Sequence, residues 1–359
     1  MQKLKPRISG PGIIAGLGAG SAAALLSLLV AQKTAFAMVM GFLAPLPLMI
    51  AAMGFGPIAG GIAVSVGALA VGVFDSRTGG LALVAPDHLG AGLLDAIVFI
   101  VTLGLPSWLM ARLAVSPIRV PKAVQSVVDP QRPEELLLGR LLTVAMAFGA
   151  ISVALGFAIA IIKLGSFQAF MDDSVRMAKP FAERLLASNR PLPKDFTAQQ
   201  VAVGVTWALT PLFAGVAVLL FVVNLWFAAR IAQMSGLLTG YWPDISRYTR
   251  VQRPLALVFA MSLGLSLAGG IVGMASLVVC GALLMGFVLQ GLAVTHAVTR
   301  GKTYRRPLLI IVYLSMLLLM PWLLAFYGLI GLLDAAFAFR DREKPAPQTP
   351  GPWQRPPAK

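Results

Sequence analysis

The residue with the clearest chemical potential in this sequence is Asp95, a carboxylate inside the long apolar run Leu89–Leu113. A carboxylate at the centre of a membrane-spanning helix costs at least about 2.5–3.5 kcal/mol, so such residues face a partner or a water-filled cavity. We therefore take Asp95 as a candidate ligand or proton site. Its depth, about 12 Å into a helix that starts at Asp87, equally fits an interfacial carboxylate or a helix–helix hydrogen bond. Lys33 and Lys163 are candidate partners.

Three further polar side chains lie in or near apolar runs, namely Asn224, Gln290 and His296. Hydrogen bonds between packed helices, worth only about 0.6 kcal/mol each on average, explain such groups adequately. The topology derived below places all three toward the membrane face opposite to Asp95. We therefore interpret them as packing residues.

Patterns that would build an active site are missing from the chain. The two histidines belong to no HExxH pair, and Cys280 lies in the apolar run VVCGALL, where a small buried side chain is expected. Residues 301–303, GKT, mimic the end of a P-loop, but the glycine required five residues earlier is His296. We accordingly predict no catalytic residue, no metal site and no cofactor, and we do not expect an enzyme.

Small residues recur at every fourth position of the first apolar run, at Gly12, Gly16, Gly20 and Ala24. This spacing lets the backbones of two helices approach closely in lipid. A dinucleotide-binding loop would need a preceding strand and an acidic residue about 20 positions later, and the sequence has neither. The stripe therefore predicts helix packing or the docking of a partner, within this chain or outside it.

The composition indicates which solvent surrounds these side chains. The chain has 359 residues, of which 58% are apolar and 12% charged, with a mean hydropathy of +0.84. Soluble domains carry about 25% charged residues, so the expected environment is the lipid bilayer. The net charge of +15 could suggest nucleic acid. Because the basic residues cluster in short segments beside the apolar runs, they indicate membrane orientation instead.

The apolar runs predict an all-α, polytopic membrane bundle of about 8–10 transmembrane helices. We divide the chain into an N-terminus (1–12), a membrane half with five helices (13–162), a polar segment (163–200), a second membrane half (201–339) and a Pro-rich tail that should be disordered (340–359). Pro45 and Pro47 predict a kink in the second run. Gly269 and Gly270 predict a reversal, and Pro321 a break in the last run.

The polar segment 163–200 contains a predicted amphipathic helix. Six apolar residues follow three- and four-residue spacing, and charged residues occupy the other face: Phe167, Met171, Val175, Ala178, Ala182 and Leu185 against Asp172, Asp173, Arg176, Lys179, Glu183 and Arg184. Such a helix can rest in the bilayer interface or cover a cavity between helices. A surface connector and a gate over a binding site both fit this pattern.

The distribution of Lys and Arg predicts the topology. With the N-terminus in the cytoplasm and eight alternating helices, the cytoplasmic segments hold sixteen Lys and Arg residues and the external ones eight. The first apolar stretch, Ile13–Ala31, is longer than the core of a signal peptide, so we expect a retained helix. The protein is therefore predicted in the cytoplasmic (inner) membrane, with segment 163–200 outside the cytoplasm.

Two stretches carry a resemblance to a known family. The order GLAVTHAVTRGK, a last apolar run and GLLDAAFAFR resembles the signature of the YybS-like predicted membrane proteins, a bacterial family with a domain of unknown function. The stretch FLAPLPLMIAAMGFGPIAGG resembles the second and third helices of that family. The resemblance covers roughly residues 10–342, and Gly331, Asp334 and Arg340 are its most distinctive positions. It implies a polytopic inner-membrane protein whose activity is not established.

That family is in turn distantly similar to the substrate-binding subunits of energy-coupling-factor transporters, helical bundles that bind vitamins within the membrane. Those subunits dock a transmembrane partner through small residues of the first helix, a role that the resemblance would give to Gly16, Gly20 and Ala24. This chain departs from them by having more helices and the long segment 163–200. The resemblance implies other membrane subunits, or a separate ATPase motor, as partners.

Two functions follow as hypotheses. In the first, the chain is a small-molecule binding or transport component with a cavity near the external face, anchored by Asp95 and covered by segment 163–200. Active uptake would then need a separate motor, because the chain carries no ATPase motif. In the alternative, it is a structural or assembly protein acting through partner proteins, and Asp95 fixes helix packing.

Overall fold

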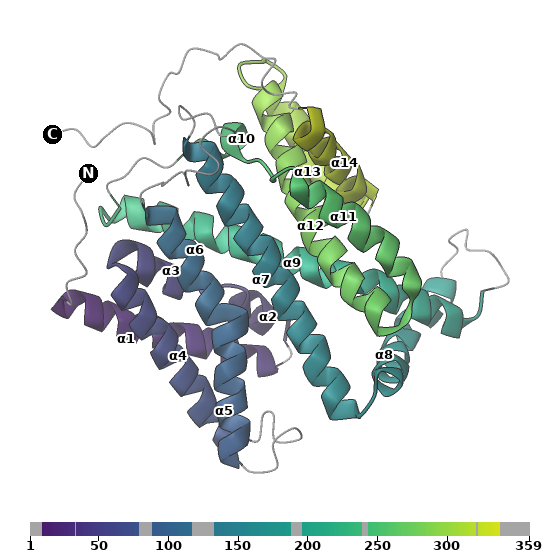
Figure 1. The fold of residues 1–359 in the computed structure, drawn as a ribbon, viewed down its shortest axis with the longest axis horizontal. Coiled ribbons are helices and arrows are strands. Elements are labelled where there is room, and N and C mark those ends of the chain that lie inside the picture. Colours follow the sequence, from purple (N-terminus) through teal and green to yellow (C-terminus); the bar gives the residue numbers. More distant parts are fainter. Residues whose placement is uncertain are drawn as a thin grey trace.

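The computed structural model describes residues 9–32, 34–78, 88–116, 133–187, 196–238, 243–320 and 322–337, and every regular element in these ranges is a helix (Figure 1). Within them, seven helical segments are long and apolar enough to cross a membrane: Gly10–Gln32, Ala35–Gly54, Pro57–Phe74, Gly90–Val115, Leu137–Leu164, Ala198–Met234 and Gly270–Val298. Two shorter apolar helices cover Pro254–Ala268 and Trp322–Phe337. The predicted all-α, polytopic bundle is confirmed. The predicted tail 340–359 and Lys33 lie outside the described residues.

The first helices, α1 to α4, show how proline divides an apolar run. The helix α1 (Gly10–Leu29) ends in a short 3-10 turn, η1 (Val30–Gln32), and α4 (Pro57–Thr78) lies beside it. The run between them is split into α2 (Ala35–Gly41) and α3 (Pro45–Gly54). Proline lacks the N–H that would continue the helix, so the predicted kink is a full break.

A buried amide from the second half of the chain compensates for this break. Asn224, 1% exposed on α9 (Ala198–Met234), donates from Nδ2 to the carbonyl oxygens of Phe42 (2.9 Å) and Leu220 (2.8 Å). Carbonyls freed in lipid must find another donor. Asn224 therefore has the packing role predicted for it. Its side chain donates a hydrogen bond to a backbone carbonyl at the point where α2 and α3 separate.

The next span is a bent rod. It consists of α5 (His88–Phe99), one π-helical turn, η2 (Ile100–Gly104), and α6 (Leu105–Val115), with Pro106 at the start of α6. Proline and π-turns are the usual causes of such bends. The Thr102 hydroxyl donates to the Val98 carbonyl, and the Thr102 carbonyl accepts from Ser152 on α7 (Pro133–Leu164), which ties the bend to the centre of the bundle.

The helix α8 (Phe167–Ala187) follows α7 after a turn at Gly165, whose φ is +84°. Its buried side chains are Phe170, Met171, Val175 and Ala182, and its charged residues face away. The apolar side packs on α9 and α7, and Phe170 and Met171 belong to one apolar cluster with Met274 of α12 (Gly270–Val298). Thus α8 lies against the ends of packed helices (Figure 1).

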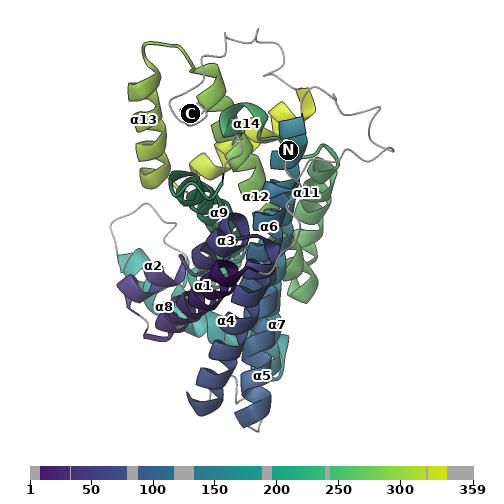
Figure 2. The same cartoon turned by 90° about the vertical axis from the view of Figure 1, so that its left-hand side faces the viewer.

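The last helices surround α12, whose span is the most buried of the seven. They are α10 (Ile245–Tyr248), α11 (Pro254–Leu265) with the 3-10 turn η4 (Ser266–Ala268), α13 (Arg305–Leu318) and α14 (Trp322–Phe337). Gly269 and Gly270 have φ of +67° and +57°, so the predicted reversal occurs there. The last run is divided between Leu318 and Trp322, and Pro321 lies outside the described residues. In Figure 2, α13 stands at the edge of the bundle while α14 lies along α12.

Candidate functional site

Asp95 and the amphipathic helix that was predicted to cover it lie in different parts of the bundle. Asp95 lies on α5 with 9% of its surface exposed. The helix α5 packs chiefly on α4, whereas α8 packs chiefly on α9 and α7. The structure therefore does not bring the amphipathic helix over Asp95. Asp95 itself remains a buried carboxylate in a candidate span.

The small-residue stripe of α1 faces α4. Gly12, Gly16, Gly20 and Ala24 are all buried. A Cβ atom on Gly16 would lie 2.8 Å from the Ala59 carbonyl oxygen, and one on Gly20 would lie 2.8 Å from Val66 Cβ. Only glycine permits this approach. In this conformation the small-residue stripe of α1 is therefore covered by α4 of the same chain and is not open to a partner.

The structure reveals a second buried carboxylate, Asp334 on α14, which is 2% exposed. Its Oδ2 accepts a hydrogen bond of 2.7 Å from Nε2 of Gln290, a fully buried residue of α12. Gln290 Oε1 in turn accepts a 2.7 Å hydrogen bond from the backbone N–H of Val251. We call these three residues the polar centre. It joins α14, α12 and the segment 244–253 between α9 and α11.

The chemistry of its neighbours fixes the orientation of the Gln290 amide. The Val251 N–H can only donate, so it requires the amide oxygen. The NH₂ group is then directed to Asp334, whose Oδ2 accepts its hydrogen bond. One side chain therefore joins Asp334 to segment 244–253, because its amide oxygen binds Val251 and its amide nitrogen binds Asp334.

Glycine brings the helices of the polar centre together. A Cβ atom on Gly331 would overlap the Phe287 carbonyl oxygen and lie 3.0 Å from the Gly291 nitrogen. Gly331 stands one turn before Asp334, and Gly291 directly follows Gln290. This close crossing gives the short Gln290 side chain its reach to both neighbours.

Charged and polar groups continue from the polar centre toward the C-terminal end of α12. Asp244 accepts hydrogen bonds from the backbone N–H (3.0 Å) and hydroxyl (2.7 Å) of Ser246, and it forms an ion pair with Arg300. Arg300 also donates to the Ser246 hydroxyl, and His296 Nε2 lies 2.8 Å from the Tyr313 hydroxyl oxygen. Segment 244–253 is therefore attached at two separate points, to Gln290 of α12 and to Arg300 just after the end of α12.

The ion pair predicts how stability depends on pH. Burial alone would raise the pKa of Asp244, but hydrogen bonds from Ser246 and Arg300 and the charge of Arg300 outweigh it and hold the pKa below its ordinary value. A lowered folded-state pKa contributes stability above the unfolded pKa of about 3.9, and this is lost as pH falls through the folded pKa. We expect Asp244→Asn to lower the melting temperature between pH 5 and 7, and this difference to shrink below about pH 4.

The control for this prediction is Asp173→Asn. Asp173 pairs with Arg176 on the exposed face of α8, where the arginine side chain is 77% exposed, and exposed pairs contribute little to stability. Melting curves of the purified protein in mild detergent should show a pH-dependent difference for Asp244→Asn alone. An equal difference for both variants, or one that persists at pH 3, would contradict the assignment.

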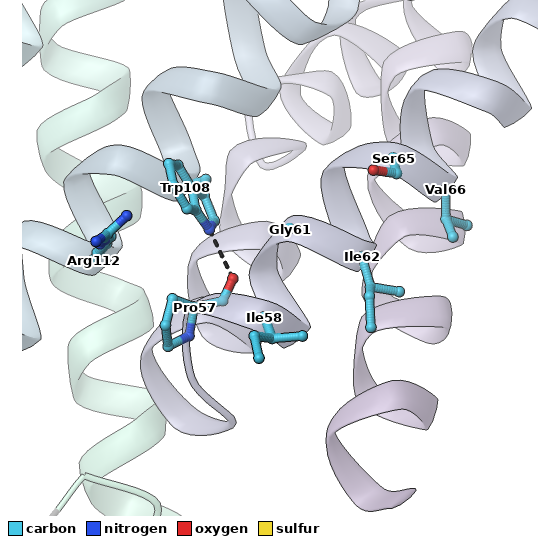
Figure 3. A pocket seen from close by; sticks show the side chains of 8 residues that line it. All are labelled: Pro57, Ile58, Gly61, Ile62, Ser65, Val66, Trp108 and Arg112. Atoms are coloured by element: carbon cyan, nitrogen blue, oxygen red, sulfur yellow. Dashed lines mark hydrogen bonds between the residues drawn. The ribbon is translucent and has the colours of Figure 1, made fainter. Parts of the chain in front are cut away.

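A groove lies between α4 and α6, away from the polar centre (Figure 3). It encloses about 610 Å³. Its walls are Pro57, Ile58, Gly61, Ile62, Ser65 and Val66 of α4, with Trp108 and Arg112 of α6. Trp108 Nε1 donates a 2.8 Å hydrogen bond to the Pro57 carbonyl, and the Arg112 guanidinium lies 5.2 Å from the centre of the indole ring. Asp95 does not line it.

Among the described residues, no group of three or more His, Cys, Asp or Glu could hold a metal ion. Sequence reasoning assigned no site role to Asp334, Val251, Trp108 or Arg112. Asp334 stands inside the last apolar run, so the rule that selected Asp95 also applies to it. Trp108 and Arg112 carry no such signal, because aromatic and basic residues are ordinary near the ends of spans.

Comparison with known proteins identifies one family model, described as a predicted membrane protein (DUF2232), which matches residues 130–335. No curated protein and no solved structure matches the chain. The matched region contains the whole polar centre. Asp95, the stripe of α1 and the groove lie before it.

Proposed function

The chain belongs to this family of predicted membrane proteins, and on that premise we propose that it is a small-molecule binding or transport component whose site is the polar centre, with Asp334 as the residue that contacts the ligand. The family and the seven candidate spans make it a multi-pass membrane protein. We place it in the cytoplasmic membrane with its N-terminus inside, on the distribution of Lys and Arg. Segment 244–253 and the C-terminal end of α12 then lie on the cytoplasmic side.

The observation that carries the proposal is the burial of Asp334 beside Gln290. Ionisable residues inside spans are costly, and they mark ligand pathways and proton sites in membrane proteins. Asp334 is 2% exposed, yet its hydrogen bond to Gln290 connects it through Val251 to segment 244–253. A ligand that binds Asp334 would therefore act on this segment through the Gln290 side chain.

A separate motor is part of the proposal. The sequence contains no ATPase motif, so active uptake would use energy supplied by a partner. The resemblance to substrate-binding subunits of energy-coupling-factor transporters supports a system in which this chain binds the substrate and a separate partner supplies the energy.

A structural or assembly role is the second candidate, favoured by the close crossing of α12 and α14. The glycines of this crossing leave no space between the helices, and both polar ends of Gln290 are used within the chain. On this alternative, Asp334 holds α14 in register, and partner proteins bind the outer surface of the bundle.

Native mass spectrometry of the purified full-length protein tests the proposal. We expect a co-purifying small molecule that is lost in Asp334→Asn, with a melting temperature within about 2 °C of the wild type. Asp95→Asn is the matched control, a buried carboxylate outside the family match. Loss of the molecule only in Asp95→Asn would move the site to α5. A large fall in melting temperature for Asp334→Asn, with no bound molecule in the wild type, would establish the structural role instead.

A further inference from the structure

The groove lies between α4 and α6, which both belong to candidate membrane spans, so a lipid in the bilayer is a natural occupant for it. Its walls are apolar along most of their length, with the small residues Gly61 and Ser65 forming the hollow. From Pro57 to Val66 the groove follows α4 for about 13 Å. Its volume, about 610 Å³, lies in the range of small-molecule sites.

One end of the groove is positively charged, and its geometry is fixed. The hydrogen bond from Trp108 to the Pro57 carbonyl holds the indole ring, and the exposed Arg112 guanidinium lies over that ring (Figure 3). Within the described residues, Arg112 forms no ion pair. The N–H groups of a guanidinium form a fork that binds phosphate in a bidentate manner.

The sequence segments before α1 and after Arg112 are also positively charged. The start of α1 packs at the Pro57 end of α4, because a Cβ atom on Gly12 would lie 3.9 Å from Ala59 Cβ. Three basic residues, Lys3, Lys5 and Arg7, precede α1 in the sequence, and a further basic stretch follows Arg112. Clusters of this kind beside a span attract anionic lipid headgroups.

We propose that this groove is a binding site for a phospholipid with an anionic headgroup. One acyl chain lies along Ile58, Ile62 and Val66, and the headgroup phosphate binds Arg112. The site is separate from the polar centre, and it does not depend on a transport role. A zwitterionic lipid of the same chain length fits the walls and carries the same phosphate, but its quaternary ammonium group would lie near the Arg112 guanidinium and be repelled, so Arg112 favours a headgroup with net negative charge.

The test uses the full-length protein, titrated in mild detergent with phosphatidylglycerol or phosphatidylcholine of identical acyl chains and observed by native mass spectrometry. For the wild type we expect one retained phosphatidylglycerol and at least a tenfold preference over phosphatidylcholine. Arg112→Gln should abolish this preference while some lipid of both kinds still binds. Arg253→Gln is the control, an exposed arginine at the start of α11 that does not line the groove.

A second variant blocks the groove without disturbing the fold. A Cβ atom on Gly61 meets no atom within 4 Å, so Gly61→Leu should fold and fill the hollow, and it should lose the retained lipid. Gly18→Leu is the matched control, because Gly18 on α1 is equally unobstructed and lies outside the groove. If Gly61→Leu fails to fold, Ser65→Phe serves the same purpose.

Three results would overturn the proposal. The first is retention of phosphatidylglycerol by Gly61→Leu or Ser65→Phe at the wild-type level, which would place the lipid elsewhere. The second is an unchanged preference in Arg112→Gln. The third is competition by glycerol phosphate at the same concentration as the lipid, which would assign the site to a free phosphate compound.

Discussion

Replacing Gly331 by alanine is expected to lower the free energy of unfolding by about 3 kcal/mol, at the upper end of the range for overpacking. The new Cβ atom would lie 2.7 Å from the Phe287 carbonyl carbon and overlap the carbonyl oxygen. Both are backbone atoms of a long helix, so no side-chain rotation can relieve the contact. The helices α12 and α14 would have to separate, and this is the most extensive helix pair in the bundle.

The matched control for Gly331→Ala is Gly264→Ala on α11. Gly264 is exposed, and its Cβ atom would meet no atom within 4 Å. The gain in helix propensity, about 1 kcal/mol at most, is the same for both substitutions, so their difference isolates the packing contact. Denaturant unfolding in mild detergent gives the measurement. Equal stabilities for the two variants would show that α12 and α14 do not cross as closely as the structure has them.

Local signals in the sequence were enough to predict most of the helices. Runs of apolar residues identified the spans, and the glycine pair at 269–270 identified the reversal before α12. Pro45 and Pro47 marked the position where α2 and α3 separate, although they predicted a kink and the structure has a full break. Each of these features depends on residues that are adjacent in the chain. The spacing of apolar residues in α8 is local in the same sense, and Met171, Val175 and Ala182 are buried as that spacing predicts.

The polar centre and the groove depend on contacts between distant residues. Asp334 and Gln290 are 44 positions apart, and Trp108 reaches the Pro57 carbonyl across 51. Hydropathy shows that a polar side chain lies in a span, but the pairing is decided by which helices cross and at what rotation. Here that choice follows from glycines at 291 and 331, whose contacts with the neighbouring helix no single apolar run reveals.

The second large effect is expected for Gln290→Met, which keeps the volume of the side chain and removes both of its hydrogen bonds. The Val251 N–H, in a residue only 3% exposed, would lose its acceptor, and Asp334 would lose the Gln290 donor. A buried polar group without its partner costs about 1–3 kcal/mol, so we expect a total loss of about 3 kcal/mol. Gln199→Met, on an exposed residue in the first turn of α9, serves as the control for the chemical change.

A double-mutant cycle between Gln290→Met and Asp334→Leu then measures the pair itself. Hydrogen bonds between membrane helices couple by about 0.6 kcal/mol on average, whereas leaving a buried polar group without its partner costs about 1–3 kcal/mol. We expect a coupling of about 2 kcal/mol, because Asp334 and Gln290 are both buried and the Val251 N–H fixes the amide orientation that donates to Asp334. A value near 0.6 kcal/mol would be that of an average helix–helix hydrogen bond, and Asp334 would then act in helix packing rather than as a centre for a ligand.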